Sequence, residues 1–210
     1  MTIDHIGLML FPHCLILRII GRVAMPLFAY MIAEGCRYTK NRTRYLSGIV
    51  TLAAVVQIIY YFALHSLYQC ILVTFALSIG LIYAADYAIN KRRTAAWFPF
   101  VLVLATAVFL ARVLPRLLRG TDFAIDYGIW GVLLPVGVYF GKNKKQQLWL
   151  CGIGLALLTA TYGSLQAFSF LALPLLMLYS GERGRMKMKY FFYIYFPAHL
   201  VVLWLLDFWI

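Results

Sequence analysis

Long apolar runs alternate with short polar or basic stretches along this chain of 210 residues. Runs such as Leu46–Leu64 approach the about 20 residues with which a helix crosses a bilayer. The pattern predicts an all-α fold, a polytopic transmembrane helical bundle that forms a single domain over residues 1–210. We expect about nine hydrophobic segments, at Thr2–Phe11, Leu15–Cys36, Leu46–Leu64, Leu67–Ile89, Ala95–Leu114, Tyr127–Phe140, Leu148–Thr161, Gln166–Tyr179 and Tyr190–Trp209.

The first of these segments is conspicuously short. A spanning helix there would need about ten more residues before Thr2, so either the helix enters the bilayer only half-way or residues that precede it are absent from this chain. The segment has no basic region before it and no small-residue cleavage site after it, so we expect no cleavable signal peptide. Segments six to eight are also short, and we expect some of them to be tilted or re-entrant.

Basic residues predict the orientation of the chain in the membrane. Most of the 19 Lys and Arg fall into four clusters, with two apolar segments between successive clusters. All four clusters can therefore lie on one side, which the positive-inside rule identifies as the cytoplasm, with the N-terminus on that side. The clusters are Arg37–Arg44, Lys91–Arg93, Lys142–Lys145 and Arg183–Lys189; Arg112, Arg116 and Arg119 fall on the opposite side.

Composition agrees with a membrane location. Only 12% of the residues are charged, against about 25% in soluble domains, and the mean hydropathy is +0.84. The net charge of +12 sits in short clusters between apolar runs, so we expect membrane lipids and no nucleic acid as partners. The cysteines and histidines show no metal-ligand spacing, so no metal is expected.

Ionisable side chains inside the apolar segments are the main candidates for function, because each costs about 2.5–3.5 kcal/mol at the centre of a membrane helix. Asp4 and His5 lie roughly 10 Å below the outer end of segment one, at 1.5 Å per residue. In segment two, Arg18 and Arg22 share a face, and Pro26 removes the hydrogen bond to the Arg22 carbonyl and is expected to kink the helix there. His199 reaches a similar depth from the other end of the chain, so we expect these five residues to converge.

Each of these groups has two readings. His5 and His199 are either buried neutral histidines or general bases. Arg18 and Arg22 either neutralise Asp4 or hold a carboxylate, a phosphate or a developing oxyanion. Adjacent helical positions point about 100° apart, so we expect Asp4 and His5 to face different partners.

Three further polar residues stand out. Glu34, at the inner end of segment two, is expected to pair with Arg37 or Lys40. Gln57 reads as a hydrogen-bonding residue between helices. Asp126 opens segment six and reads first as a helix N-cap or first-turn acid, and otherwise as a substrate contact.

Blocks at both ends of the chain resemble the TraX family: IDHIG, LRIIGRVAMPLFAYMIAEGCRYTKNRTRYL and YFFYIYFPAHL. The middle fits as well, with VVQIIY, DYGIWG and LALPLLMLYSGERG. These are polytopic inner-membrane proteins named for the conjugative-pilin N-acetylase. The family is similar to a broader superfamily of transmembrane acyltransferases, which includes the family-three O-acetylases and the lysosomal heparan glucosaminide N-acetyltransferase. Family members usually carry more hydrophobic residues before the Asp-His pair than this chain does.

The resemblance implies acetyl transfer from cytoplasmic acetyl-coenzyme A to an acceptor, either a pilin N-terminal amine or an envelope glycan. It implies catalytic roles for His5, Asp4, His199, Arg18 and Arg22, with His5 as the preferred base and Arg18 or Arg22 as oxyanion donor. We expect the donor to bind near Glu34, Arg37, Tyr38, Lys40 and Arg42, and the acceptor near Asp126 and Gln57. A proton-coupled transporter and a non-enzymatic pilus-assembly factor are the alternatives, and the sequence leaves the oligomeric state open.

Overall fold

The computed structural model describes residues 1–182 and 189–209, and within them the chain is helical with no β-strand. Three stretches add short irregular helices, the 3₁₀ turns η1 (Thr94–Trp97) and η3 (Ser164–Leu171) and the π-turn η2 (Phe109–Val113). The α-helices are α1 (Thr2–Met9), α2 (Leu15–Arg22), α3 (Ala24–Tyr38), α4 (Arg42–Leu64), α5 (Ile71–Lys91), α6 (Phe98–Val108), α7 (Leu114–Leu117), α8 (Gly128–Phe140), α9 (Lys144–Tyr162), α10 (Ala172–Leu178) and α11 (Lys189–Trp209).

These helices fall into the stretches that the apolar runs predict. Four of them are long and apolar enough to cross a membrane: Leu15–Tyr38, Arg42–Ala63, Ile71–Lys91 and Thr94–Leu117. The first is α2 followed by α3, interrupted at Val23, three residues before Pro26. The break lies where the kink is predicted, because Pro26 cannot donate to the preceding turn.

Several segments differ from their predictions in extent: α4 begins at Arg42, four residues before the predicted Leu46, and α5 begins at Ile71, four residues after the predicted Leu67. α9 begins at Lys144, four residues before the predicted Leu148, because the Asn143 side chain accepts a hydrogen bond from Gln146 N at 2.9 Å and caps the helix. Hydropathy alone misses the first turn, since Lys and Gln fill it. The fourth predicted basic cluster falls on residues 183–188 and on the side chain of Lys189, outside the described part of the chain.

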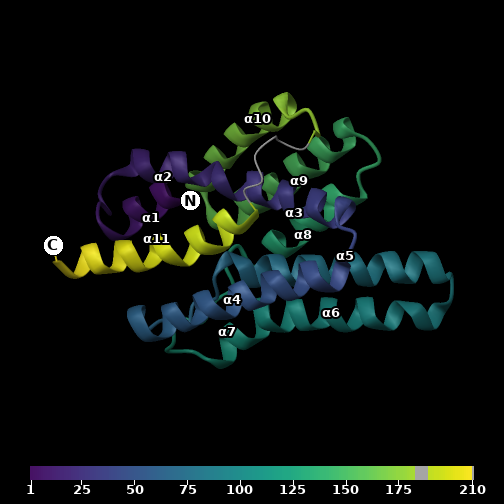
Figure 1. Cartoon of the computed structure of the whole chain (residues 1–210), viewed down its shortest axis with the longest axis horizontal. Coiled ribbons are helices and arrows are strands. Elements are labelled where there is room, and N and C mark those ends of the chain that lie inside the picture. Colours follow the sequence, from purple (N-terminus) through teal and green to yellow (C-terminus); the bar gives the residue numbers. More distant parts are fainter. Residues whose placement is uncertain (183–188, 210) are drawn as a thin grey trace.

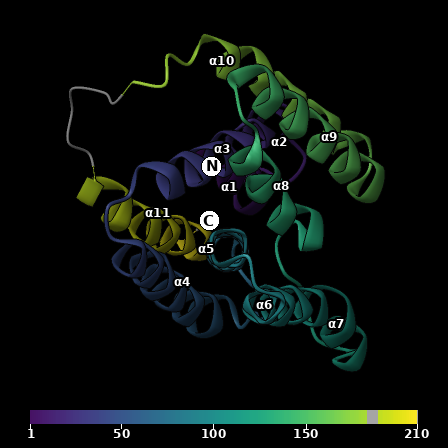
Figure 2. The same ribbon diagram turned by 90° about the vertical axis from the view of Figure 1, so that its right-hand side faces the viewer.

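The long helices α4, α5 and α6 lie side by side, and α11 runs along α4 (Figure 1). Seen along the molecule, α3 and α8 lie between this group and the pair formed by α9 and α10 (Figure 2). The main core joins α3, α5, α8 and α9 and includes the fully buried Ala29, Ile79, Val138 and Leu155. A smaller cluster joins α11 to α4.

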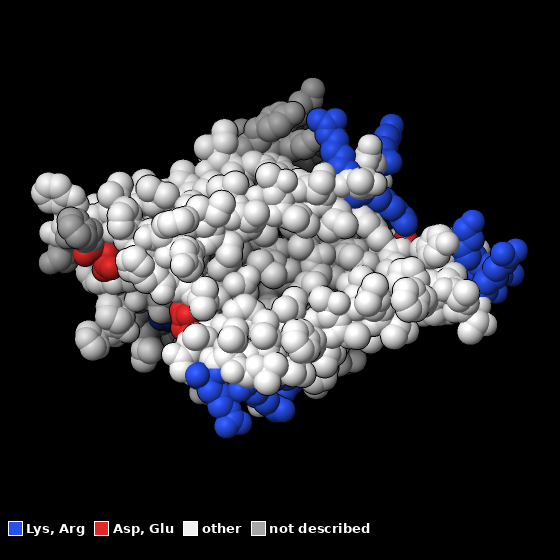
Figure 3. Space-filling model, turned by 90° about the horizontal axis from the view of Figure 1, so that it is seen from below, with Lys and Arg blue, Asp and Glu red and all other residues white. Residues whose placement is uncertain are grey.

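Because α11 packs on both α4 and α1, the last helix of the chain closes against the first. On the face that Figure 3 shows, Lys and Arg gather toward one end, with a second group at lower left. A few acidic side chains lie toward the other end, and the broad surface between carries few charges. A surface with few charges between charged ends is what embedding in a bilayer requires.

Candidate functional site

The first two helices pack so closely that their backbones nearly touch. Gly7 and Gly21 are both buried at this contact. A Cβ on Gly21 would lie 2.7 Å from Asp4 Cα, and one on Gly7 would lie 2.8 Å from Leu17 Cβ. Glycine at both positions therefore lets α1 bring Asp4 against α2, on the face that carries the two arginines.

We predict that Gly21→Ala destabilises the protein by about 1–3 kcal/mol, the usual cost of overpacking. The added methyl has to displace α1, because the atoms in its way belong to the Asp4 backbone and Cβ rather than to a flexible side-chain end. Thermal unfolding in detergent measures the effect. Gly137→Ala is the matched control, since its nearest atom, Leu150 Cβ, lies at an ordinary 3.8 Å; equal melting temperatures for the two variants would contradict the prediction.

Asp4 lies between the two arginines of α2. Its Oδ1 is 2.9 Å from Arg18 Nη1 and 3.2 Å from Arg22 Nη2, and all three side chains are at most 19% exposed. The carboxylate thus neutralises one of two neighbouring positive charges. This agrees with the interpretation in which Arg18 and Arg22 pair with Asp4. Arg22 also donates through Nη1 to Tyr127 Oη at 3.2 Å and to Gln166 Oε1 at 3.4 Å.

His5 faces away from Asp4 and meets His199 of α11. His5 Nδ1 lies 3.0 Å from His199 Nε2, and His199 Nδ1 lies 2.9 Å from the Tyr195 carbonyl oxygen. A carbonyl only accepts, so His199 Nδ1 carries a hydrogen; in the neutral ring its Nε2 is then an acceptor, and His5 Nδ1 must donate to it. His5 Nε2 is left with a free lone pair, which makes it the basic nitrogen of the pair.

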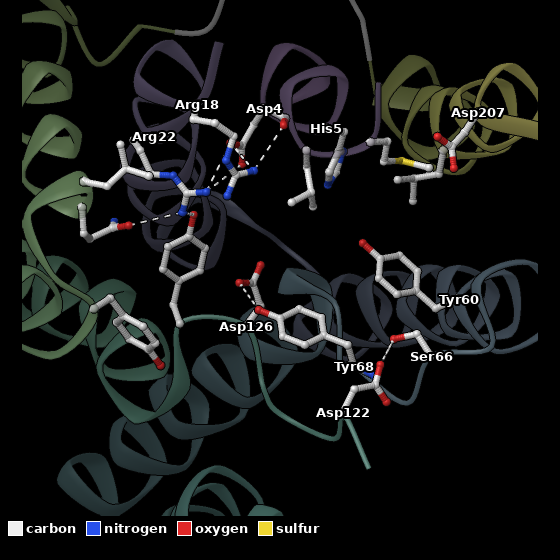
Figure 4. A pocket seen from close by; sticks show the side chains of 17 residues that line it. Asp4, His5, Arg18, Arg22, Tyr60, Ser66, Tyr68, Asp122, Asp126 and Asp207 are labelled. Carbon is white, nitrogen blue, oxygen red and sulfur yellow. Dashed lines mark hydrogen bonds and ion pairs between the residues drawn. The ribbon is translucent and has the colours of Figure 1, made fainter. Parts of the chain in front are cut away.

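One cavity of about 660 Å³ is lined by Asp4, His5, Arg18, Arg22, Tyr127 and Gln166, and His199 contacts His5 from outside this lining. In Figure 4, Arg22, Arg18, Asp4, His5 and Asp207 form one row, and Asp126, Tyr68, Tyr60, Ser66 and Asp122 face it from below. The first row comes from α1, α2 and α11, and the second from the end of α4 and the loops before α5 and α8. The convergence that the depth argument predicted is therefore present: His5, Asp4, Arg18, Arg22 and His199 meet from both ends of the chain.

The prediction that Asp126 caps a helix is wrong. Tyr127 is the N-cap residue of α8, and no side chain caps that end. The Asp126 carboxylate instead accepts from the Tyr68 hydroxyl at 2.7 Å, and the Asp126 main-chain oxygen accepts from Thr74 Oγ1 at 2.7 Å. Tyr127 adopts a left-handed conformation, and the Asp126 side chain before it lines the cavity.

Burial raises the pKa of the Asp126 carboxyl to about 6, against the opposing effects of the Tyr68 hydroxyl and the Arg22 charge. Between pH 4 and 6 the folded protein then holds a proton that the unfolded chain has lost, so stability falls as the pH rises through this window. Above pH 6, the free energy of unfolding is lower by about 3 kcal/mol than it would be without this pKa shift.

We predict that Asp126→Asn melts higher than the wild type at pH 7.5 and at the same temperature near pH 4, because asparagine does not ionise. Asp122→Asn is the control, because the pKa of Asp122 is shifted in the opposite direction. Hydrogen bonds from Ser66 Oγ and Leu67 N lower the pKa of Asp122, so its contribution is lost as the pH falls. Melting curves for wild type and both variants from pH 4 to 7.5 test this, and an unchanged profile in Asp126→Asn would refute it.

Gln57 holds a loop beside the cavity and does not line the cavity itself. Its Nε2 donates to the Tyr68 carbonyl at 2.9 Å, and its Oε1 accepts from Cys70 N at 3.4 Å. The side chain thereby fixes the loop that carries Tyr68. Gln57 is predicted to bond between helices, and its partners are instead backbone groups of the loop that leads into α5. Its predicted contact with the acceptor stays a prediction.

The residues expected to bind the acyl donor lie around the end of α3. Glu34 pairs with Arg37 at 2.7 Å, as one of the two predicted alternatives. Arg37 also donates to the carbonyls of Val138, Tyr139 and Gly141, where α8 ends. Its guanidinium is thus occupied as a helix C-cap. Tyr38 and Lys40 are exposed, and Arg42 pairs with Asp86 at 2.6 Å, so three of the five remain open to a ligand or to exchange of partners.

Sequence reasoning missed most of the other residues that line the cavity, and two of them, Tyr127 and Gln166, contact Arg22. Tyr127 follows the noted Asp126 in DYGIWG, and Gln166 is a lone amide at the start of an apolar segment. The second was a usable signal, since a polar side chain there needs a partner. Neither could be joined to Arg22 without the packing of η3 and the α8 turn on α2.

A match to a known protein family shows which family the chain belongs to. The TraX protein family matches residues 1–207. The chain belongs to the TraX family. This agrees with the resemblance carried by the N-terminal and C-terminal blocks, and the same two blocks supply the histidine pair of the cavity.

Two relatives illustrate the range of the TraX family. The probable fimbrial assembly protein FimC, serogroup H1, of Dichelobacter nodosus is 25% identical over 97% of this chain and 89% of its own length. An uncharacterised protein of Rickettsia prowazekii (strain Madrid E) is 29% identical over 72% of this chain and 55% of its own length, so the match spans about half of that relative. No solved structure matches the chain.

Proposed function

We propose that this TraX-family protein is a membrane-embedded acetyltransferase, which moves an acetyl group from acetyl-coenzyme A to an amine or hydroxyl acceptor. One observation carries the proposal: the histidine pair leaves His5 Nε2 as a free basic nitrogen beside a cavity large enough for reacting groups. Acyl transfer needs a base for the acceptor's proton. The family's naming for the conjugative-pilin N-acetylase agrees with this chemistry.

In the proposed reaction, the acceptor nitrogen or oxygen attacks the thioester carbonyl carbon while His5 Nε2 takes its proton. A tetrahedral intermediate forms. Its collapse breaks the C–S bond, and the His5 imidazolium returns the proton to the leaving thiolate, so that the products are the acetylated acceptor and free coenzyme A. His199, fixed by the Tyr195 carbonyl, holds His5 in the required tautomer and stabilises the imidazolium.

The proposed location is the bacterial inner membrane, with several passes and the N-terminus in the cytoplasm. The basic clusters between pairs of apolar segments support this orientation. Acetyl-coenzyme A would then arrive from the cytoplasm, and the acceptor would be a pilin N-terminal amine or an envelope glycan. The name of the FimC relative, a probable fimbrial assembly protein, favours the pilin.

The same name supports a second candidate, a pilus-assembly factor without enzymatic activity. In that reading the pairing of Asp4 with both arginines stabilises the bundle and does nothing more. The two functions differ in one measurable property, which is the binding and turnover of the thioester.

The test is acetyl-coenzyme A binding by the purified protein in detergent, measured by titration calorimetry, together with release of free thiol over time. We expect binding and slow hydrolysis, which accelerates with an acceptor. A peptide with a free N-terminal amine and an amino sugar, offered separately, identify the acceptor class. A helical protein that neither binds acetyl-coenzyme A nor releases thiol would favour the assembly factor and end the acetyltransferase proposal.

A further inference from the structure

One corner of the cavity holds more hydrogen-bond donors than acceptors. Arg22 Nη1 donates to the Tyr127 hydroxyl oxygen at 3.2 Å and to Gln166 Oε1 at 3.4 Å. A guanidinium has no acceptor, so both partners must receive. The hydroxyl hydrogen of Tyr127 and the amide hydrogens of Gln166 are therefore directed elsewhere.

Those hydrogens find no acceptor among residues 1–182 and 189–209. Gln166 is only 3% exposed, and its Nε2 and the Nε of Arg22 are buried without a partner. A buried polar group left unpaired costs about 1–3 kcal/mol, and its presence in a native structure requires an explanation. A ligand that brings an acceptor oxygen to this corner would supply one.

The backbone at Tyr127 is strained, and two hydrogen bonds hold it in place. Tyr127 has φ +58°, a left-handed conformation that costs a residue with a side chain about 1–2 kcal/mol. Thr74 Oγ1 donates to the Asp126 carbonyl at 2.7 Å, and Gly131 N donates to the Tyr127 carbonyl at 2.9 Å. Such conformations persist where the surroundings over-determine them, and they cluster at functional sites.

The arginines themselves are committed to other partners. Arg18 Nη1 and Arg22 Nη2 face Asp4, and Arg22 Nη1 is shared between Tyr127 and Gln166. Tyr127 differs from them. Its hydroxyl oxygen accepts a hydrogen bond from the Arg22 guanidinium, and its hydroxyl hydrogen remains available to donate. A hydroxyl polarised in this way is a stronger donor than an isolated phenol.

We propose that Tyr127 is a catalytic residue of the acetyl transfer, an inference that rests on the proposed function. Its O–H donates to the acetyl carbonyl oxygen as this oxygen gains negative charge in the tetrahedral intermediate, and Arg22, held by Asp4, supports it from behind. The role that sequence reasoning assigned to Arg18 or Arg22 thus passes to the tyrosine that Arg22 contacts. No proton leaves Tyr127; the C–S bond breaks and His5 carries the proton as described above.

Tyr127→Phe tests this, with Tyr162→Phe as the matched control. Tyr162 also lines the cavity and packs edge-on against Tyr127, but the hydrogen bonds of Arg22 to described residues do not include it. We expect kcat for acetyl-coenzyme A turnover to fall about 10²–10³-fold in Tyr127→Phe, as for the loss of one oxyanion donor, with KM and melting temperature near wild type. Tyr162→Phe should stay within threefold of wild type.

A second measurement does not depend on turnover. The probe is the ketone analogue of acetyl-coenzyme A, in which a methylene replaces the sulfur. Binding to the wild type should shift the infrared carbonyl band of this analogue to lower frequency, and binding to Tyr127→Phe should not. If Tyr127→Phe does not fold, the band in the wild type decides, and an unshifted band overturns the proposal.

The outcomes separate the two proposals. Normal turnover by Tyr127→Phe with a lowered melting temperature would make Tyr127 a partner that only positions Arg22, and would overturn this inference while leaving the acetyltransferase intact. A wild type that neither binds nor hydrolyses acetyl-coenzyme A would remove the proposed function, and the role of Tyr127 with it.

Discussion

His5→Ala should lower acetyl-coenzyme A turnover by about 10²–10⁴-fold, the contribution of a well-placed general base. The reason is geometric: His5 Nε2 is the one nitrogen of the histidine pair that is not used in the chain from His5 to the Tyr195 carbonyl. His5 lines the cavity, and His199 is buried behind it. The measurement is the initial rate of thiol release in detergent.

His199→Ala should cause a smaller loss, because His5 keeps its place but loses the acceptor that fixes its tautomer. The exposed His13 and His65 provide matched controls, and their alanine variants should turn over at the wild-type rate. A larger loss in His199→Ala than in His5→Ala would reverse the assignment of the base. Equal and small losses in both variants would leave the pair with a structural role alone.

Asp4→Ala should destabilise the protein by about 3–5 kcal/mol, the cost of removing one partner from a buried ion pair. Arg18 and Arg22 are at most 19% exposed, and Asp4 is the carboxylate that lies between them. Without it, two like charges face each other in a poorly hydrated site. The expected result is a large fall in melting temperature in detergent.

The control for this variant is the ion pair between Arg42 and Asp86. Arg42 is 47% exposed there, so Arg42→Ala should cost at most about 1 kcal/mol. The double variant Asp4→Ala/Arg18→Met should recover part of the lost stability, because it removes one of the two unpaired charges. If Asp4→Ala proved no more harmful than Arg42→Ala, the cluster would be hydrated in solution and the arginines free to bind an anion.

The structure agrees best with the sequence-based predictions for features that depend on residues close together in the chain. Apolar runs predicted the helical stretches, because a helix in a membrane satisfies its backbone hydrogen bonds within its own segment. The kink beside Arg22 followed from Pro26, and the meeting of His5 with His199 followed from depth, since a constant rise per residue converts position in a segment into height in the bilayer.

Sequence reasoning assigned a wrong partner, or none, where the direction of a side chain around its helix axis or an irregular backbone decides what the side chain contacts. Asp126 read as a helix cap, but Tyr127 occupies the N-cap position and the Asp126 carboxylate accepts from the Tyr68 hydroxyl. For Arg37, a role toward the acyl donor stays a prediction, but the sequence did not show that this side chain closes the end of α8. Both residues contact segments about 60 to 100 positions away in the chain, which hydropathy does not register.

The chain by itself therefore determined where the apolar helical segments lie, and it predicted an orientation and a common depth for the ionisable groups. These properties depend on composition and spacing within one segment. The tertiary structure decided which of those groups touch. The buried Gly21 brings Asp4 between two arginines, the packing of α11 on α1 orders the tautomers of the histidines, and the turn before α8 places Tyr127 against Arg22. Hydrogen bonds are directional and short, so only the packing of side chains in three dimensions can assign them.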